Sequence, residues 1–372
     1  MKIDEKLRKY MLFAIGGIIL FILIIFLLSR CSRTRVYGAD EIPELKQWLI
    51  EVAKRYYQDN ESYLPNIGYT ITLSLDTLVQ AERMRPLYEI IRDGEFCTGE
   101  ITVTNHDGYI LYIPKINCGD LYTSRTLRDV LLDESNIVTS GHGLYNVNND
   151  FVFRGEIVNN HIWFANRLWL ILRITEDNKV KIMETENRDL VVWDNRFNPT
   201  SDGRGGINTF IRNNVNSRIR DRMMNIYNNP NEFSYTDKAH LIPHNLCVGG
   251  RTETDSVYVN VECFEILENQ LLGLITVYDF LQVSLDENCI ITRNRSCVNY
   301  NFLARIQRPF WTITPDSEST FRTFRITNGV DLVNTSSSNA SIKLTTKISG
   351  DLPIYRGDGS ADNPFELITS PR

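Results

Sequence analysis

The sequence predicts an α+β protein with an N-terminal transmembrane helix, a small helix-plus-sheet domain and a larger β-rich domain. Three observations carry this prediction: a 19-residue apolar block near the start, helical periodicity soon after it, and runs of strand-forming residues from about residue 151. A length of 372 residues suits about two domains behind an anchor. The expected parts are a cytoplasmic tip (1–10), a transmembrane helix (11–29), a small α+β domain (41–120), a connector (121–150) and a β-rich domain (151–370).

Composition excludes several classes of protein. Hydrophobic residues make up 42% and charged residues 23%, which is ordinary for globular chains and argues against disorder, coiled-coil rods, collagen-like fibres and polytopic transporters. The net charge of −6 argues against nucleic acid as a partner, because neutralising phosphates needs a basic surface.

The apolar block, Met11–Ser29, contains no charged residue and is long enough for a helix to cross a bilayer. A cleaved signal peptide and a lipoprotein anchored at Cys31 are the alternatives. Basic residues before the block favour a cytoplasmic N-terminus. Beyond residue 30 the chain has 35 Lys and Arg against 44 Asp and Glu, a net charge of −9. The expectation is a single-pass cell-membrane protein whose C-terminal bulk is extracellular.

Cysteine spacing supports this location. An even number of closely spaced cysteines without any C-x-x-C motif indicates disulfides in an oxidising compartment more than a zinc site. Pairing of nearest neighbours is the favoured interpretation, and buried free thiols are the alternative. The three expected pairs are Cys97/Cys118, Cys247/Cys263 and Cys289/Cys297.

The small domain begins with apolar residues at steps of three and four, which predict an amphipathic helix over 42–59. Ser74 is a candidate N-cap for a second, short helix that runs through Met84. Two strand-like runs flank Asn105–Gly108 and predict a hairpin. Cys97 and Cys118 bracket that hairpin.

The connector contains a short helix over 127–132 and a glycine-rich stretch. In the larger domain, the pattern predicts strands, one longer helix and one short helix. The strands are expected over 151–154, 161–164, 168–175, 179–184, 271–275, 310–314, 321–327 and 342–346, and the helices over 207–227 and 277–283.

Candidate binding residues each have a structural alternative. Trp163 and Trp169 lie in predicted strands, where a tryptophan either packs in the core or stacks on a ligand. Arg204 lies in a glycine-rich ribbon before a predicted helix, and such a ribbon is either a plain loop or an anion cradle.

Oxygen side chains also alternate near the C-terminus, at Asp358, Ser360 and Asp362. This spacing partly matches a calcium loop, and a turn between terminal strands is the alternative. No catalytic motif for metalloproteases, serine hydrolases or nucleotide-binding enzymes occurs in the chain. The sequence therefore predicts no catalytic residue and no cofactor other than calcium.

Several segments together resemble a family. In the C-terminal part they are Asn136–Tyr145, Phe153–Glu156, Asn159–Asn160, Trp163–Phe164, Leu168–Trp169, Gly273–Ile275, Tyr278–Asp279, Trp311–Pro315, Gly357–Ser360 and Asn363–Phe365. In the N-terminal part they are Lys46–Asn60, Pro65 and the pair Cys97/Cys118. These runs resemble membrane-anchored surface proteins of low-GC Gram-positive bacteria that are largely uncharacterised. Their C-terminal module is similar to C-type-lectin-like and formylglycine-generating-enzyme folds, and their first domain is similar to a pilin-like stalk. The resemblance covers most of residues 41–368.

The resemblance implies a non-enzymatic surface protein that presents a lectin-like head for adhesion or surface organisation. Its partners would be the membrane, through the N-terminal helix, and a glycan, a wall polymer or a surface protein, and self-association is possible. A structural subunit of a pilus-like assembly is the first alternative. A formylglycine-generating-type enzyme is the second.

Overall fold

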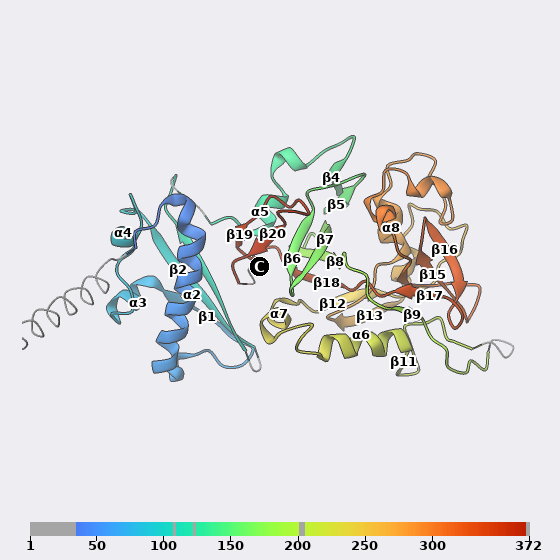
Figure 1. Cartoon of the computed structure of the whole chain (residues 1–372), viewed down its shortest axis with the longest axis horizontal. Coiled ribbons are helices and arrows are strands. Elements are labelled where there is room, and N and C mark those ends of the chain that lie inside the picture. The colour runs from blue at the N-terminus through green and yellow to red at the C-terminus, as the bar shows by residue number, and fades with distance from the viewer. Residues whose placement is uncertain (1–34, 107–108, 121, 123, 201–204, 370–372) are drawn as a thin grey trace, which may run out of the picture.

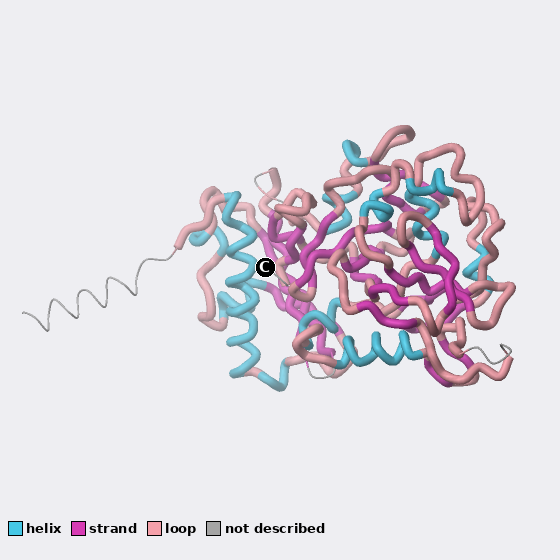
Figure 2. Tube along the Cα trace, turned by 45° about the vertical axis from the view of Figure 1, so that its right-hand side comes forward, coloured by secondary structure: helices cyan, strands magenta, loops and turns pink. Residues whose placement is uncertain are grey.

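The computed structural model describes residues 35–106, 109–120, 122, 124–200 and 205–369. These residues form a mixed α+β structure dominated by strands, with a small body and a larger one side by side (Figure 1). The coarse fold class is therefore confirmed. Figure 2 shows the longest helix in the small body and most of the strands in the larger one. The predicted transmembrane segment, Met11–Ser29, lies outside the described residues. No helix among the described residues is long and apolar enough to cross a membrane.

The small domain is one helical layer on an antiparallel sheet of order β1-β2-β3, as far as the structure describes it. Helix α2 (Ile42–Asp59) buries its apolar stripe against that sheet, and Pro43 occupies its first turn, where the missing N–H costs nothing. Ser74 accepts a hydrogen bond from the N–H of Asp76 and so caps α3. The remaining elements are α3 (Leu75–Gln80), α4 (Leu87–Ile90), β1 (Thr70–Ser74), β2 (Thr98–His106) and β3 (Tyr109–Asn117).

The predicted hairpin is confirmed, and it is longer than expected. Strands β2 and β3 pair from Thr98–Asn117 at one end to His106–Tyr109 at the other. A disulfide between Cys97 and Cys118 closes the open end of this hairpin. By joining the two strands at one end, it holds them in register. The register matters because a slip by one residue would turn every buried side chain of the hairpin outward.

The larger domain contains, in the described part of the chain, two main sheets. One has eight strands, with the path β18-β8-β7-β6-β20-β19 and with β5 and β4 branching from β7. The other has five strands in the order β16-β15-β14-β17-β9. The first sheet is built from β4 (Gly143–Val147), β5 (Asp150–Arg154), β6 (His161–Phe164), β7 (Arg167–Ile174), β8 (Lys179–Glu184), β18 (Thr345–Ser349), β19 (Ile354–Arg356) and β20 (Phe365–Leu367).

The second sheet and the peripheral elements complete the larger domain. The second sheet contains β9 (Leu190–Val192), β14 (Phe310–Pro315), β15 (Arg322–Ile326), β16 (Val330–Asn334) and β17 (Asn339–Ser341). Around the sheets lie β10 (Ile211–Arg212), β11 (Val215–Asn216), β12 (His244–Cys247), β13 (Ile266–Gln270), α5 (Leu127–Leu131), α6 (Arg218–Asn228), α7 (Tyr235–His240) and α8 (Val277–Val283).

One continuous core joins both sheets of the larger domain. Trp169, Trp193 and Trp311 are wholly buried in it, and Trp193 meets Trp311 edge to face with the ring centroids 5.9 Å apart. Buried indoles need partners for their N–H groups, and those of Trp169 and Trp311 donate to backbone carbonyls of Phe164 and Val191. The small domain has a separate core of its own.

The long helix predicted over 207–227 is wrong in its first half. Helix α6 begins only at Arg218, after Ser217, whose side chain accepts from the N–H of Arg220. The preceding residues form the β10–β11 hairpin, because Asn213 and Asn214 adopt positive φ angles of 48° and 61°. Two consecutive residues of that kind make a two-residue hairpin turn.

Two predicted strands of the larger domain are also displaced. The segment 271–275 is buried but contains only an isolated bridge, from Gly273 to Thr345, and the neighbouring strand β13 ends at Gln270. Strand β18 spans Thr345–Ser349 instead of 342–346. Hydrophobicity marks both segments correctly as buried, but burial alone does not set hydrogen-bonded pairing.

Residues expected in the connector are integrated into the larger domain. Strand β4 pairs along its length with β5, and Leu127, Leu131 and Leu144 are buried in the larger core. The two bodies also touch: α7 lies against β3, α2 lies against β19, and Ile113 of β3 packs on the larger core (Figure 1). The first domain is thus seated on the second.

Lys46 is a buried, destabilising charge in the small domain. Its side chain is wholly buried on α2, and its ammonium has no hydrogen-bond partner among the described residues. Burial lowers the pKa of Lys46 from 10.5 to about 8. The charged form is retained at pH 7 at a desolvation cost that the ring of Tyr122, 5.3 Å away, offsets only in part.

We expect Lys46→Met to raise the free energy of unfolding at pH 7 by about 1–3 kcal/mol, because it removes a buried charge and keeps the volume. Wild-type stability should also rise from pH 8 to 9.5, since the unfolded state holds the Lys46 proton more tightly than the folded state. The variant should lack that part of the rise. Urea titrations at several pH values measure both effects. Lys54→Met, at an exposed position on the same helix, is the control, and an equal gain there would contradict the explanation.

Candidate functional site

Of the tryptophans singled out for ligand binding, Trp169 is a core residue. Trp169 is wholly buried and packs edge to face on Phe164 and Phe233. That burial keeps it away from any ligand at the surface. Trp163 is half-buried in β6, where it pairs with Leu168 of β7. Arg204 lies outside the described residues.

The C-terminal oxygen side chains form a turn. The N–H of Ser360 donates to Asp358, and the N–H of Asn363 donates to the hydroxyl of Ser360. Hydrogen bonds from the backbone and side chain of Ser360 lower the pKa of Asp358. Asp362 is exposed. Within the described residues, no group of three or more His, Cys, Asp or Glu side chains is placed to hold a metal ion.

A different part of the larger domain, which we call the head, has the features of a binding site. Two cavities of about 240 and 290 Å³ share Tyr278, the second residue of α8, in their walls. We call the pair the groove. Its floor comes from β5, β7, β8, β12 and β18, and its walls come from α8 and from loops closed by disulfides.

Three cations lie in register across adjacent strands on the floor of the groove. Arg173 of β7 pairs with Lys181 of β8, which in turn pairs with Lys347 of β18. We call these residues the cationic row. Like charges directly opposite each other destabilise a sheet, so the row imposes a cost on this fold.

Asp279 neutralises only part of the cationic row. It accepts hydrogen bonds from Arg173 at 3.0 Å and from Lys181 at 2.6 Å, and as the third residue of α8 it also accepts the N–H of Thr276. Burial opposes ionisation of Asp279, but the nearby charges of Lys181 and Arg173 outweigh it and hold the pKa well below its usual range. Both of its oxygens are therefore engaged.

His244, the first residue of β12, is the second unusual group in the groove. Its Nδ1 lies 3.0 Å from the carbonyl oxygen of Ile242, which can only accept, so the proton sits on Nδ1. Burial, reinforced by the charge of Lys181, lowers the pKa of His244 to about 4. The ring is therefore neutral at pH 7, and its Nε2 is a buried acceptor without a partner among the described residues.

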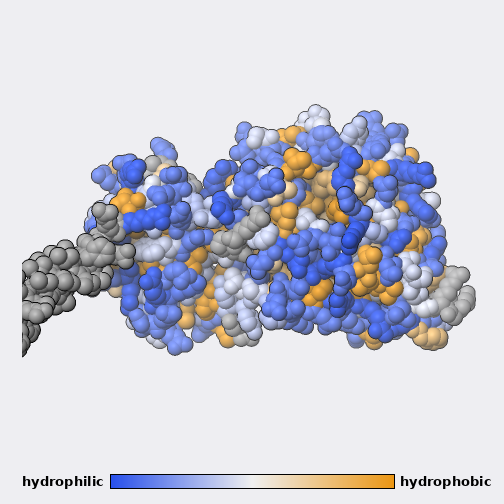
Figure 3. Space-filling model, in the orientation of Figure 1, coloured by the Kyte–Doolittle hydropathy of each residue, from blue (hydrophilic) through white to orange (hydrophobic). Residues whose placement is uncertain are grey.

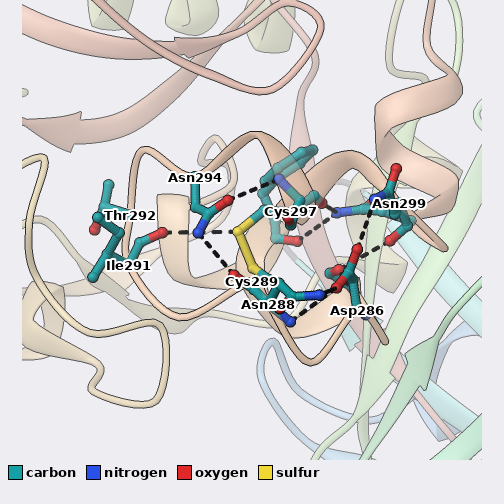
Figure 4. The surroundings of a disulfide bond; sticks show 12 residues. Asp286, Asn288, Cys289, Ile291, Thr292, Asn294, Cys297 and Asn299 are labelled. Atoms are coloured by element: carbon teal, nitrogen blue, oxygen red, sulfur yellow. Dashed lines mark hydrogen bonds between the residues drawn. A yellow bond between two sulfur atoms is a disulfide. The ribbon is translucent and has the colours of Figure 1, made fainter.

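Disulfides hold the rim of the groove. Cys247–Cys263 and Cys289–Cys297 close two loops, which we call the 247–263 loop and the 289–297 loop, and these pairings are the predicted ones. Asparagine and aspartate side chains brace the smaller loop from within (Figure 4): Asn294 donates to the carbonyl of Asn288, and Asn299 donates to Asp286. Within the described residues all six cysteines are oxidised, so none of them offers a thiol.

A buried ion pair connects the two loops. Arg251 and Glu262 are both wholly buried, and the guanidinium donates to both carboxylate oxygens of Glu262, at 3.1 and 2.9 Å. Arg251 also donates to the hydroxyl of Thr292 in the 289–297 loop. Glu262 accepts the N–H of Tyr278 at 2.9 Å, which fixes the start of α8.

Exposed apolar side chains gather on these same loops. Tyr258 is 73% exposed, Phe264 74% and Ile290 53%. Much of the molecular surface is hydrophilic, with scattered hydrophobic residues (Figure 3), and a cluster of exposed apolar side chains beside a cavity is a candidate contact surface. Of these three residues Tyr258 lines the groove, whereas Phe264 and Ile290 follow the cysteines Cys263 and Cys289 in the chain.

A larger cavity, of about 470 Å³, provides a contrast. It is lined by Arg167, Arg188 and Glu232 among others, and these charges neutralise one another. Arg188 donates to both oxygens of the buried Glu184 and to Glu232, and Arg167 also donates to Glu232. This cavity therefore has the character of a structural ion-pair network.

No protein-family model matches this chain, and neither the curated proteins nor the solved structures contain a match to it. The geometry of the groove is therefore the basis for a functional proposal.

Sequence reasoning missed the groove. Lys181 and Lys347 are far apart in the chain and become neighbours only through the register of β8 and β18. The alternation Lys179-Val180-Lys181 shows a polar strand face, which is the single local signal, and it is equally typical of a solvated face.

We expect Arg251→Met to lower the free energy of unfolding by about 3–5 kcal/mol, because Glu262 would remain buried without its counter-charge. Chemical denaturation measures the loss. Arg293→Met is the matched control, since Arg293 pairs with Glu253 at the surface of the same loops and should cost less than about 1 kcal/mol. Equal losses for the two variants would show that the burial of the pair is unimportant.

Acidification should destabilise the head before its carboxylates titrate. The folded state keeps His244 neutral down to about pH 4, whereas the unfolded state takes up the proton near pH 6.5. Stability contributed by this histidine is present above pH 6.5 and is lost as the pH falls towards 4, by about 3 kcal/mol in total. Urea titrations between pH 7 and 4.5 measure the slope, and His244→Asn should reduce it. An unchanged slope would mean that His244 is protonated in the folded state.

Proposed function

We propose that this chain is a membrane-anchored extracellular surface protein that is not an enzyme and whose head binds a ligand or partner in adhesion or surface organisation. The N-terminal helix would hold it in the membrane, and the small domain, as a pilin-like stalk, would raise a lectin-like head above the surface. The three disulfides are consistent with an extracellular or secreted location.

The observation that carries the proposal is the groove with its fixed rim. Ligand sites are concave, largely pre-formed, and combine apolar walls with a few placed polar groups. The groove has these properties, since two disulfides and the pair Arg251–Glu262 hold the loops of its walls, Tyr258 lines one of its cavities, and the cationic row lines the other. A rigid rim of this kind reduces the entropy that binding would otherwise lose.

The test is binding by the full chain in detergent to arrayed glycans, to wall polymers and to whole Gram-positive cells. We expect saturable binding that the double variant Tyr258→Ser, Phe264→Ser weakens at least about tenfold, because Tyr258 lines the groove, Phe264 is exposed next to its disulfide-closed loop, and aromatic side chains supply much of the energy of binding. Unchanged thermal unfolding would show that this variant is folded.

Tyr63→Ser, Phe96→Ser is the matched control, because both residues are exposed aromatics of the small domain, at 63% and 85%. This control should bind as the wild type does. Binding to none of the arrayed ligands or cells, or an equal loss in both double variants, would contradict a ligand-binding head.

A further inference from the structure

The chemistry of the groove narrows the class of ligand. This inference rests on the proposed function, because it names the ligand of the same head. The relevant space is the cavity of about 240 Å³ that is lined by Arg173, Lys181, Lys347, His244, Tyr278 and Asp279. That volume is below the usual range for drug-sized ligands and suits a single small unit, such as one sugar ring.

The cavity has more cationic than anionic side chains, which favours an anionic ligand. Asp279 forms ion pairs with Arg173 and Lys181, and Asp150 lies 3.6 Å from Arg173. Lys347, at the end of the cationic row, makes no ion pair and no side-chain hydrogen bond with any described residue.

Lys347 is half-buried. Burial, together with the charge of Lys181, lowers the pKa of Lys347. The charge of Asp177 favours the charged form of Lys347, but the salt bridge of Asp177 is with Lys179, at 2.7 Å. A ligand carboxylate or phosphate would therefore supply Lys347 with the salt bridge that it lacks among the described residues.

The unpaired acceptor Nε2 of His244 favours a ligand with a hydroxyl group that can donate a hydrogen bond. Because the Nδ1 proton is donated to Ile242, the buried Nε2 can only accept, and an inorganic anion without a proton offers it nothing. A buried acceptor without a hydrogen bond destabilises the folded state, because it has lost its contact with water. A ligand that carries both a negative group and a hydroxyl would satisfy Lys347 and His244 together.

Tyr278 gives the ligand its shape and direction. Its ring forms part of the wall of this cavity and of the neighbouring one, of about 290 Å³, which Tyr258 also lines. An aromatic side chain offers an apolar face with a polar tip, which suits the mixed C–H and O–H surface of a sugar or polyol. The second cavity leaves room for the next unit of a chain.

We propose that the groove binds a hydroxylated anion that is one unit of an acidic polymer: an acidic saccharide or a polyol phosphate. The negative group would accept hydrogen bonds from Lys347, a hydroxyl would donate to Nε2 of His244, and the ring or chain would lie along Tyr278. Carboxylate and phosphate share this chemistry, and the experiment distinguishes them.

The experiment is calorimetric titration of the full chain in detergent with glucuronate, glycerol 3-phosphate, glucose and sulfate. We expect one of the two hydroxylated anions to bind at least about tenfold more tightly than glucose, which lacks the charge, and than sulfate, which lacks the hydroxyl. Tighter binding of glucuronate assigns an acidic saccharide, and tighter binding of glycerol 3-phosphate assigns a polyol phosphate.

Two variants test the assigned contacts. Lys347→Gln should weaken binding of the favoured anion at least about tenfold, and Lys115→Gln, at an exposed lysine of the small domain, should not change it. His244→Asn should weaken binding of the hydroxylated anion and leave that of sulfate unchanged. Equal binding of glucose, or unchanged affinity in Lys347→Gln, would overturn the proposal.

The two proposals fail separately. Rim-dependent binding to the arrays or cells without saturable binding of either anion overturns the ligand class and leaves the binding head in place. The absence of binding in the arrays, on cells and in calorimetry overturns both.

Discussion

The ion pair between Arg251 and Glu262 is the constraint on which the head depends. Both side chains are fully buried, so their charges are satisfied only if the surrounding backbone takes one arrangement. That arrangement places the carbonyl of Ser256, the hydroxyl of Thr292 and the N–H of Tyr278 around the pair. The two disulfide-closed loops and the start of α8 are therefore positioned by one interaction, and the rim of the groove is a consequence of it.

A buried ion pair contributes little net stability, because desolvation cancels much of the attraction between its charges. Its value here is geometric. The loops have little regular secondary structure. Apolar side chains packed between them would hold them together, but such contacts have no preferred direction and would not set the relative positions of the loops. The bidentate contact between a guanidinium and a carboxylate has a defined direction, and the disulfides limit what each loop can do when the pair is formed.

Much of the architecture could be predicted from residues that are close together in the sequence. The groove could not be predicted in this way. The apolar period of α2, the hairpin around Asn105–Gly108 and the pairing of neighbouring cysteines are set by residues close in the chain, and each is found as predicted. The start of α6 was missed because the turn at Asn213–Asn214 overrides a helical pattern that continues through it.

The cationic row depends on register between strands that lie far apart in sequence. Hydrophobic periodicity predicts β8 and indicates a strand near β18, but nothing in either strand predicts that Lys181 faces Lys347. The same is true of Arg251 and Glu262, whose burial depends on loops with no regular period. Residues of these kinds, charged and buried, are where sequence patterns predict least, because their burial is decided by tertiary packing.

The two charged cavities of the head show that the unpaired row is not a general property of this fold. Around Arg167 and Arg188 the chain supplies Glu184 and Glu232, and the charges are matched inside the protein. In the groove it supplies Asp279 and Asp150, which pair with Arg173 and Lys181, and it leaves Lys347 without a salt bridge among the described residues. The two clusters therefore differ in how completely the chain matches its own charges. Departures of this kind from local consistency are expected at functional sites more than elsewhere in a fold.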